Sequence, residues 1–331
     1  MRTCLVTGGC GFIGSHLVDD LVASGNKVRV LDDLSTGNPA NLGHVRGQID
    51  LMIGSITDTS KIQDAVTGCE VIFHLAALPS VVKSVEDPLA CHEICATGSL
   101  KVLDAARKAG VRRVVYAASS SAYGDQAGAV RHESDPLMPL SPYAAAKLAG
   151  EHYCACCTAV YGLETVRLRF FNVFGPRQDA NSPYSGVIAL FIAALSAGRT
   201  PAIFGDGLQG RDFVYVTNVV QALARAANAP AQAVAGHVYN VGNGQSTSIL
   251  DLVRHLNRLL GKSIEPLHAP VRAGDVRQSE ADIANARRDL AYEPNVSFEE
   301  GLARTLRYYQ EIISGEPRAS ATGGSYCKSE K

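Results

Sequence analysis

The stretch Thr7–Gly14, TGGCGFIG, lies between a short apolar run and a segment of helical length. Gly9, Gly11 and Gly14 satisfy the pattern Gly-x-Gly-x-x-Gly, and Gly8 precedes them. A tight turn, close approach of the backbone to a pyrophosphate and close helix packing each favour a residue without a Cβ atom. The helix that follows offers free N–H groups to an anion. The stretch therefore predicts a dinucleotide site within a βαβ unit.

Short apolar runs and segments of helical length alternate on both sides of this stretch. The runs typical of buried strands are Thr3–Thr7, Val28–Leu31, Val71–Leu75, Val114–Ala118 and Thr165–Phe171, and helical patterns include Ile13–Ser24 and Gly98–Ala109. This alternation predicts an α/β fold in which a doubly wound parallel (Rossmann) sheet has helices on both faces.

The pattern becomes irregular after Phe171, with Gly and Pro in NVFGPRQDANSPYSG and FGDGLQG. We therefore expect residues 1–172 and 214–243 to form the dinucleotide-binding domain, and residues 173–213 and 244–313 to form a smaller α/β lobe that binds the substrate. Residues 314–331 lack apolar periodicity, which predicts a flexible tail.

Two helices of the smaller lobe are predicted from their amino-terminal signals. Ser248 with Asp251, and Ser297 with Glu300, have the spacing of capping boxes. After the first of these signals, one helical face carries only apolar residues, which indicates core: Ile249, Leu252, Val253, Leu256 and Leu260.

The composition excludes several classes of protein. The 331 residues carry 31 Lys+Arg and 32 Asp+Glu, so the balanced charge argues against a nucleic-acid partner. No apolar run approaches the ~18 residues of a membrane span, and Met1 leads almost at once into a predicted strand. We expect a cytoplasmic protein without a membrane partner, and the odd count of nine cysteines fits a reducing compartment.

An acidic residue at the end of the second predicted strand sharpens the dinucleotide prediction. Asp32 can accept hydrogen bonds from the hydroxyls of the adenosine ribose. With Asp33 beside it, the pair would repel a 2′-phosphate, which favours NAD over NADP.

A serine run and a Tyr-x-x-x-Lys pair are the candidate catalytic residues. Ser119–Ser121 follows a predicted strand, and Tyr143 and Lys147 lie four apart in a helical stretch and so share one face. Tyr143 could remove a hydroxyl proton if nearby positive charge stabilises its phenolate, and Lys147 would supply such charge and bind the nicotinamide ribose. The alternative is a solvated lysine beside a half-buried tyrosine.

Between Thr3 and Tyr309 the sequence resembles the extended short-chain dehydrogenase/reductase family, and within it the nucleotide-sugar epimerases, particularly those that invert C4 of UDP-glucose or UDP-N-acetylglucosamine. The resemblance rests on ordered markers: TGGCGFIG, LDDLSTG, FHLAA, SSSAYG, SPYAAAK, RFFNVFGPRQ, GDGLQGRDFVYV and RAGDVRQSEAD. One departure is Ser55, where the family often has an acid.

This resemblance implies which residues bind NAD: Gly8, Gly11, Phe12, Ile13, Gly14, Asp32, Ile56, Asp58, Leu75, Tyr143 and Lys147. Counting back from Tyr123 favours Ser119 as the catalytic hydroxyl, with Ser120 and Ser121 as substrate neighbours, although the choice among the three serines stays open.

The resemblance also implies the substrate side of the site. Guanidinium groups suit a nucleoside diphosphate, and the expected contacts are Asn172, Arg177, Arg211, Arg272 and Asp275. Ser279 would face the 2-substituent of the hexose, where a small side chain leaves volume for an N-acetyl group. A homodimer is expected through the helices near Gly98–Ala109 and Tyr143–Cys156.

These inferences predict a UDP-hexose 4-epimerase that acts through a 4-keto intermediate, with UDP-GlcNAc/UDP-GalNAc favoured and UDP-Glc/UDP-Gal as a possible second pair. A dehydratase is disfavoured because SSSAYG lacks the required acid pair. A UDP-glucuronate enzyme is an alternative that would need an added cation. A nonenzymatic NAD(H) sensor is another, but it needs no reactive triad.

A metal site is not expected. The run Cys154–Cys157, CACC, continues the helix of Tyr143 and lacks the C-x₂-C pairs that bind zinc, despite His152 nearby. Cys154 and Cys157 are expected to pack as small hydrophobic residues.

Overall fold

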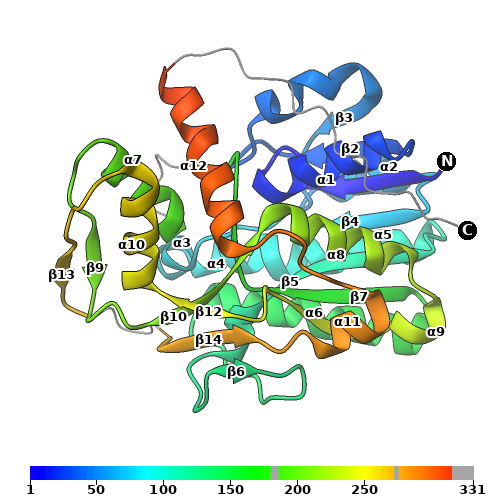
Figure 1. The fold of residues 1–331 in the computed structure, drawn as a ribbon. Helices are drawn as coiled ribbons and strands as arrows, with labels where there is room; N and C mark the ends of the chain where they lie inside the picture. Colours follow the sequence, from blue (N-terminus) through cyan, green and yellow to red (C-terminus); the bar gives the residue numbers. More distant parts are fainter. Residues whose placement is uncertain (180–185, 272–275, 315–331) are drawn as a thin grey trace, which may run out of the picture.

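The computed structural model describes residues 1–179, 186–271 and 276–314. Its main feature is a seven-stranded sheet in the order β11-β7-β5-β4-β1-β2-β3, in which all neighbours are parallel (Figure 1). The strands are β1 (Thr3–Thr7), β2 (Lys27–Asp32), β3 (Ile49–Ile53), β4 (Val71–His74), β5 (Arg113–Ser119), β7 (Glu164–Phe170) and β11 (Val238–Val241). The predicted Rossmann sheet is therefore confirmed.

Helices cover both faces of this sheet. On one face α1 (Phe12–Ala23) and α8 (Val216–Asn228) pack against each other, and on the other lie α2 (Thr59–Val66), α5 (Ser99–Lys108) and α6 (Pro142–Tyr161). Successive strand residues point to opposite faces. Accordingly, Cys4 and Val6 join the core beneath α1 and α8, whereas Leu5 joins the core beneath α2, α5 and α6.

The strand order reverses at β1, which places the ligand crevice. From β1 the chain proceeds outward to β2 and β3, then returns to the other side of β1 with β4. In open α/β sheets, ligands bind outside the carboxyl ends of the strands at such a reversal. The glycine stretch follows β1 at this point. Around the same edge the chain forms α3 (Val81–Glu86), α4 (Pro88–His92), a π-helical segment (Glu93–Gly98) and a 3₁₀ turn (Ser120–Tyr123).

A smaller lobe stands beside the carboxyl edge of the sheet. It contains α7 (Val187–Ser196), α10 (Ile249–Leu260) and α12 (Phe298–Ser314), and its core includes Phe174, Phe213 and Phe298. Its sheets comprise β12 (Ser246–Ser248), β10 (Gly210–Tyr215), β14 (Gln278–Ala281) and β6 (Val130–Arg131) in that order, β8 (Asn172–Phe174) paired with β10, and the pair β13 (Leu267–Ala269) and β9 (Ala202–Phe204).

Both capping predictions in this lobe are confirmed. The Ser248 hydroxyl accepts a hydrogen bond from the Asp251 N–H at 3.0 Å, and the Ser297 hydroxyl accepts one from the Glu300 N–H at 3.2 Å. The predicted apolar face of α10 packs into the lobe's core, with Ile249, Leu252, Val253 and Leu256 buried and Leu260 partly buried.

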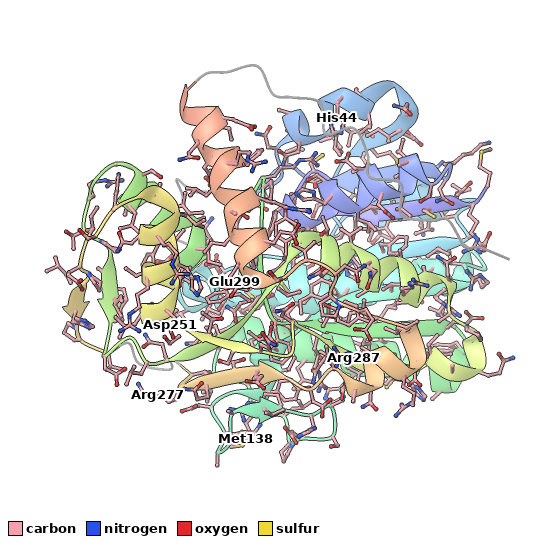
Figure 2. The ribbon with its side chains drawn as sticks, in the orientation of Figure 1. His44, Met138, Asp251, Arg277, Arg287 and Glu299 are labelled. Carbon is pink, nitrogen blue, oxygen red and sulfur yellow. The ribbon has the colours of Figure 1, made fainter. Side chains whose placement is uncertain are left out.

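One helix that was expected in the smaller lobe packs against the large sheet instead. The helix α11 (Ala284–Leu290) packs against β11 and α8, and Ala286, Leu290 and Tyr292 belong to the core of the larger sheet. The expected division had placed all of 244–313 in the smaller lobe. Figure 2 shows Arg287 of α11 beside the larger sheet, at a distance from Asp251 and Arg277 on the smaller lobe. The expected tail, apart from Ser314 at the end of α12, lies outside the described residues.

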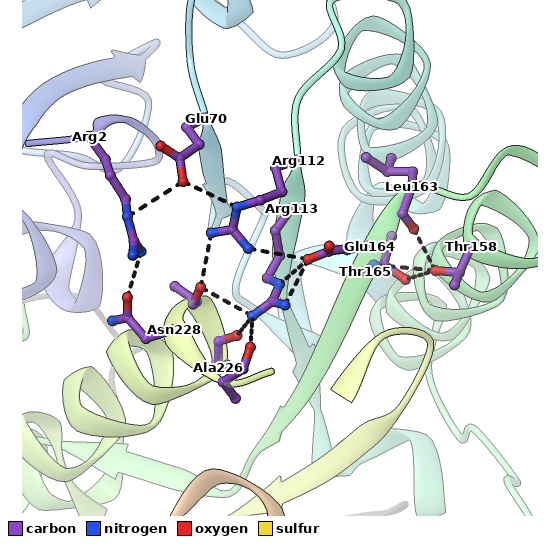
Figure 3. A network of polar contacts seen from close by, with 12 residues as sticks. Arg2, Glu70, Arg112, Arg113, Thr158, Leu163, Glu164, Thr165, Ala226 and Asn228 are labelled. Carbon is purple, nitrogen blue, oxygen red and sulfur yellow. Dashed lines mark hydrogen bonds and ion pairs between the residues drawn. The ribbon is translucent and has the colours of Figure 1, made fainter. Parts of the chain in front are cut away.

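Arginine side chains form a network of polar contacts at the amino edge of the large sheet (Figure 3). Arg113 is 1% exposed, and its guanidinium bonds Glu164 at 2.7 Å and the carbonyls of Ala226, Ala227 and Ala229 at 2.7–3.1 Å. It thereby satisfies carbonyl groups that the carboxyl end of α8 leaves free.

Two short helical segments, a 3₁₀ helix (Pro39–Gln48) and α9 (Ala231–Val234), complete the domain. No helix in the described part of the chain has the length and apolarity needed to cross a membrane.

Candidate active site

A large cleft runs along the carboxyl edge of the sheet. Its volume is about 1440 Å³, whereas pockets for one drug-sized ligand measure roughly 300–1,000 Å³, so there is room for a dinucleotide and a second ligand together. The predicted site residues that line it are Gly8, Gly11, Phe12, Ile13, Gly14, Asp32, Ile56, Leu75, Ser119, Ser120, Ser121, Tyr143, Lys147, Asn172, Arg177, Arg211 and Ser279.

Three predicted residues are not placed in the cleft. Arg272 and Asp275 lie outside the described residues. Asp58 is the N-cap of α2, where its carboxylate accepts hydrogen bonds from the N–H groups of Ser60 and Lys61. The Ser60 hydroxyl also donates to this carboxylate at 2.7 Å, and this bond, followed by the N–H bonds, holds the pKa of Asp58 below its ordinary value. Asp58 is thus explained by helix capping, and a contact with the cofactor stays a prediction.

The glycine stretch forms a cradle that side chains would fill. Gly8 has φ +72°, and a Cβ atom there would lie 2.8 Å from the Ala76 nitrogen. A Cβ atom at Gly14 would lie 2.1 Å from the Gly8 oxygen, so helix α1 and the turn touch backbone to backbone. Gly11 is the N-cap of α1 and makes no side-chain cap bond, which leaves N–H groups for an anion. This geometry fits a pyrophosphate.

Asp32 is built into the wall of the cradle. Its carboxylate accepts hydrogen bonds from the Cys10 N–H at 2.8 Å and the Leu34 N–H at 2.9 Å, while burial raises its pKa against the effect of both bonds. Asp33 beside it is exposed and bonds Ser35. Two carboxylates at this position disfavour a 2′-phosphate, as expected for NAD.

The catalytic candidates converge from two elements. Ser119 ends β5, and its hydroxyl lies 2.8 Å from that of Ser121. Tyr143 lies in the first turn of α6, which Ser141 caps through the Ala144 N–H at 3.1 Å. Lys147 follows one turn later and is 2% exposed. The Ser119 hydroxyl lies near enough to the Tyr143 phenol to lower its pKa.

Burial is the dominant influence on the protonation of the tyrosine in the cleft. Burial raises the pKa of Tyr143 above its ordinary value, the thiols of Cys95 and Cys91 add to this, and the nearby Ser119 hydroxyl lowers it. The Lys147 ammonium lies over the ring of Tyr116, with Nζ 4.3 Å from the centroid, and its lowering of the Tyr143 pKa together with an oxidised nicotinamide stays a prediction. The phenol is therefore neutral until further positive charge enters the cleft.

The substrate side is carried by β8, β10 and β14. Arg211 on β10 and Ser279 on β14 are paired in register, and both line the cleft with Asn172 of β8. Arg177 is held at φ +67° and donates from Nη2 to Asp19 of α1 at 2.7 Å, while its buried Nη1 has no hydrogen-bond partner among the described residues. One arm of Arg177 is thus a structural bond to α1, which the sequence could not indicate.

Several cleft residues escaped sequence reasoning. The loop after β2, from Leu34 to Gly37, lies within the marker LDDLSTG and lines the cleft, yet only Asp32 and Asp33 of this marker were singled out. Lys83 of α3 and Arg131 of β6 also line the cleft. A usable signal existed for Lys83, because it follows the carboxyl end of β4 closely. Arg131 gave none, since its position depends on pairing of β6 with β14.

The cysteines behave as expected for core residues. Cys154 is fully buried and Cys157 nearly so, and both pack in the core beneath α6. Burial raises the pKa of both thiols. Among the described residues, no group of three His, Cys, Asp or Glu side chains is placed to hold a metal ion.

The cradle, the Asp32 carboxylate and a Tyr–Lys pair in one cleft define the class: an enzyme that uses a nicotinamide dinucleotide on an alcohol or ketone. The chain belongs to the NAD dependent epimerase/dehydratase family, whose model matches residues 4–242. The predictions of an enzyme, of its family and of NAD as cofactor are thereby confirmed.

The chain is similar to proteins that act on nucleotide sugars. A UDP-glucose 4-epimerase of Mycolicibacterium smegmatis is 42% identical over 319 residues, which cover 94% of this chain and 99% of the relative. The structure of a UDP-glucose 4-epimerase of Thermotoga maritima with UDP-glucose has TM-score 0.89 and 37% identity, covering 94% and 99%. A UDP-N-acetylglucosamine 4-epimerase of Methanobrevibacter ruminantium, in complex with UDP-N-acetylmuramic acid, gives the same four values.

Proposed function

We propose that this enzyme inverts C4 of UDP-hexoses through a 4-keto intermediate. The observation that carries the proposal is the convergence of Ser119, Tyr143 and Lys147 on the cleft that also holds the glycine cradle. The carboxylates that line the described part of the cleft are Asp32, Asp33 and Asp179, so none lies in the serine segment. Such an arrangement suits proton and hydride transfer and lacks an acid beside the serines for expelling water.

The residues divide the work of proton transfer. Bound NAD supplies a reversible acceptor for the C4 hydride. Tyr143 takes the proton of the 4-hydroxyl, and Ser119 holds the same oxygen by a hydrogen bond. The cation Lys147 and the positive charge of the oxidised cofactor favour the phenolate that burial disfavours. After the hexose turns over, the hydride returns to the opposite face of C4 and the same tyrosine returns the proton, so the reaction has no net redox change.

The diphosphate would be held while the hexose turns. Arg211 and the unpartnered Nη1 of Arg177 are the described cations proposed for this task, with Asn172 beside them. Guanidinium groups provide fixed donors to phosphate oxygens. Arg272 and Asp275 remain proposed contacts from the undescribed segment.

We propose UDP-GlcNAc and UDP-GalNAc as the preferred pair. Ser279 is a small side chain that lines the cleft on β14, and a small residue leaves volume for an N-acetyl group. The similarity to solved structures is equal for a UDP-N-acetylglucosamine 4-epimerase and a UDP-glucose 4-epimerase, so the choice rests on Ser279. UDP-Glc and UDP-Gal are the proposed second pair.

A uronate is the second candidate, because one observation favours it. Lys83 of α3 lines the cleft, and α3 packs against α6, whose first turn carries Tyr143. Lys83 is a cation of the kind that a sugar carboxylate would need. Under this reading Lys83→Ala would abolish turnover of UDP-glucuronate and spare that of UDP-GlcNAc.

The test of the function has two readouts. Protein purified without added cofactor and then denatured should release NAD⁺ or NADH, because an enzyme that re-reduces its own product gains nothing by releasing the cofactor. The same protein should interconvert UDP-GlcNAc and UDP-GalNAc in competition with UDP-Glc and UDP-glucuronate. Release of NADP, or failure to convert any UDP-hexose, would overturn the proposal.

A homodimer is proposed through α5 and α6, which pack side by side. Large apolar side chains are exposed on them and on the adjoining α4: Leu89 (80% exposed), Leu100 (37%), Tyr153 (39%) and Val160 (68%). Exposed apolar area of this kind favours association. Sedimentation at micromolar concentration should show a dimer that Leu100→Asp with Tyr153→Asp converts to monomer, and a wild-type monomer would refute it.

A further inference from the structure

One buried aromatic side chain contacts both the ammonium group and the backbone carbonyl of the proposed catalytic lysine. Tyr116 of β5 is fully buried, and its ring lies beneath the Lys147 ammonium with Nζ 4.3 Å from the centroid. Its hydroxyl donates a hydrogen bond to the Lys147 carbonyl at 3.1 Å. The negative face of an aromatic ring attracts an ammonium group. We propose that Tyr116 is a positioning residue that fixes the charged end of Lys147 in the active site.

The helix above is shaped to admit this ring. A Cβ atom at Gly150 of α6 would lie 2.2 Å from the Tyr116 hydroxyl oxygen and 2.7 Å from the adjacent ring carbon. Glycine within a helix is less favourable than alanine. The glycine nevertheless sits three residues after Lys147, where it lets Tyr116 reach the lysine's own turn of helix.

The other side of the ring rests on a fixed, neutral histidine. The rings of His74 and Tyr116 lie 5.6 Å apart between centroids. The Ser99 hydroxyl donates to the Cys95 carbonyl, so its oxygen accepts from Nε2–H of His74 at 2.9 Å, and Nδ1 accepts from the Thr7 hydroxyl at 2.8 Å. Both ring nitrogens are thus engaged, and Tyr116 is held between His74 and α6.

The ring is a partner whose attraction does not depend on pH in the working range. Burial lowers the pKa of Lys147, and burial raises the pKa of Tyr116 well above its ordinary value. Burial, and then the Lys147 charge, lower the pKa of His74 to about 3, so this histidine adds no second positive charge. The other titratable groups that act on the lysine are Cys91, Cys95, Glu151 and Cys154.

The consequence concerns catalysis, and it rests on the proposed function. Lys147 must keep its proton and its place for Tyr143 to lose a proton. Removal of the ring would leave the ammonium in a buried site without this attraction. The lysine would then lose its proton at lower pH, and it would bind the nicotinamide ribose less well.

The experiment compares Tyr116→Leu and Tyr116→Phe with a matched pair at Tyr239. Tyr239 is 1% exposed on β11 of the same sheet, its hydroxyl also donates to a backbone carbonyl at 3.1 Å, and it does not line the cleft. Tyr116→Phe keeps the ring and should stay within about threefold of wild type in kcat. Tyr116→Leu should lower kcat by about tenfold or more with little change in KM, and should move the alkaline limb of the pH profile down by about one unit.

A second readout does not depend on turnover. Tyr116→Leu should retain less NAD after purification than Tyr116→Phe, whereas Tyr239→Leu, with a similar loss of thermal stability, should retain the wild-type amount. The inference is overturned if Tyr116→Leu keeps the wild-type alkaline limb and NAD content, or if Tyr239→Leu changes both equally. If Tyr116→Leu does not fold, a trifluorinated phenylalanine at 116 carries the same test, because it keeps the ring's shape and weakens its negative face. If wild type converts no UDP-hexose, the function fails, and the NAD comparison still decides the role of Tyr116.

Discussion

The two edges of the seven-stranded sheet are made by the same strands, yet they differ in how far their buried polar groups are hydrogen-bonded. At the amino edge, Arg113 meets Glu164 and three backbone carbonyls, so its donors are engaged. At the carboxyl edge, α1 begins without a side-chain cap, and the buried atoms Arg177 Nη1 and Gln178 Oε1 have no partner in the part of the chain that the structure describes. Buried polar groups without partners lower stability. One edge therefore stabilises the fold, and the other keeps groups available for ligands.

The largest expected effect is on activity, at the carboxyl edge. Tyr143→Phe removes the proposed base and keeps the ring, so turnover should fall by about 10²–10⁴-fold, while thermal stability stays close to wild type. Calorimetric titration with UDP-hexose should show binding retained. Turnover like that of wild type in this variant would exclude the phenol as the base.

The next effect is on stability alone, at the amino edge. Arg113→Met would remove the buried donor of Glu164 and of the end of α8 and leave only the 3.3 Å bonds from Arg112, so the free energy of unfolding should fall by about 3 kcal/mol. Chemical denaturation measures this, and kcat of the folded variant should be unchanged. The control is Arg112→Met, because Arg112 is 35% exposed and its ion pairs are worth under about 1 kcal/mol. Equal losses in both variants would contradict the assignment.

A third effect is a pH dependence of stability that arises from His74 at the carboxyl edge. Burial, and then the Lys147 charge, lower the pKa of His74 at the end of β4 to about 3, below its unfolded value of about 6.5. The unfolded chain therefore binds the proton first, and stability is full above about pH 6.5 and falls as the pH drops toward 3. Between pH 7 and pH 5, protonation of His74 in the unfolded chain should lower the free energy of unfolding by about 2 kcal/mol.

The measurement is the change in unfolding free energy between these two pH values, in wild type and in His74→Gln. Buried Asp212 has a pKa raised by burial to about 6 and acts in the opposite direction, but equally in both proteins. The variant should therefore show a smaller acid-induced loss than wild type. An identical pH dependence would show that His74 is not held neutral.

Sequence reasoning succeeded where the cause is local. The strand Thr3–Thr7, the start of α1 and the Ser248 cap depend on neighbours in the chain, and each was found within a residue of its place. The edge strand β3 was missed because IDLMI is only partly buried and carries no continuous apolar run.

The rest depends on contacts between distant segments. The bond of Arg177 to Asp19 spans 158 residues, and the position of α11 on the large sheet follows from packing against β11 and α8. The place of the Lys147 ammonium also depends on a contact with a distant segment. Four residues of separation place Tyr143 and Lys147 on one helix face, but Tyr116, 31 residues before Lys147, decides where the ammonium lies.

The smallest expected effect is on selectivity, at the outer wall of the carboxyl edge. Ser279→Tyr would fill the volume proposed for the N-acetyl group, so the preference for UDP-GlcNAc over UDP-Glc should fall by about tenfold or more, with UDP-Glc turnover kept. Side chains alternate along a strand, and Glu280 next to Ser279 does not line the cleft, so Glu280→Tyr is the control and should leave the preference unchanged. Competition between the two sugars in one vessel measures the ratio directly. A pocket excludes large groups better than it rejects small ones, which is why the change is expected in one direction only. Equal depression of both activities, or refusal of UDP-GlcNAc by wild type, would contradict the substrate assignment and leave the epimerase proposal standing.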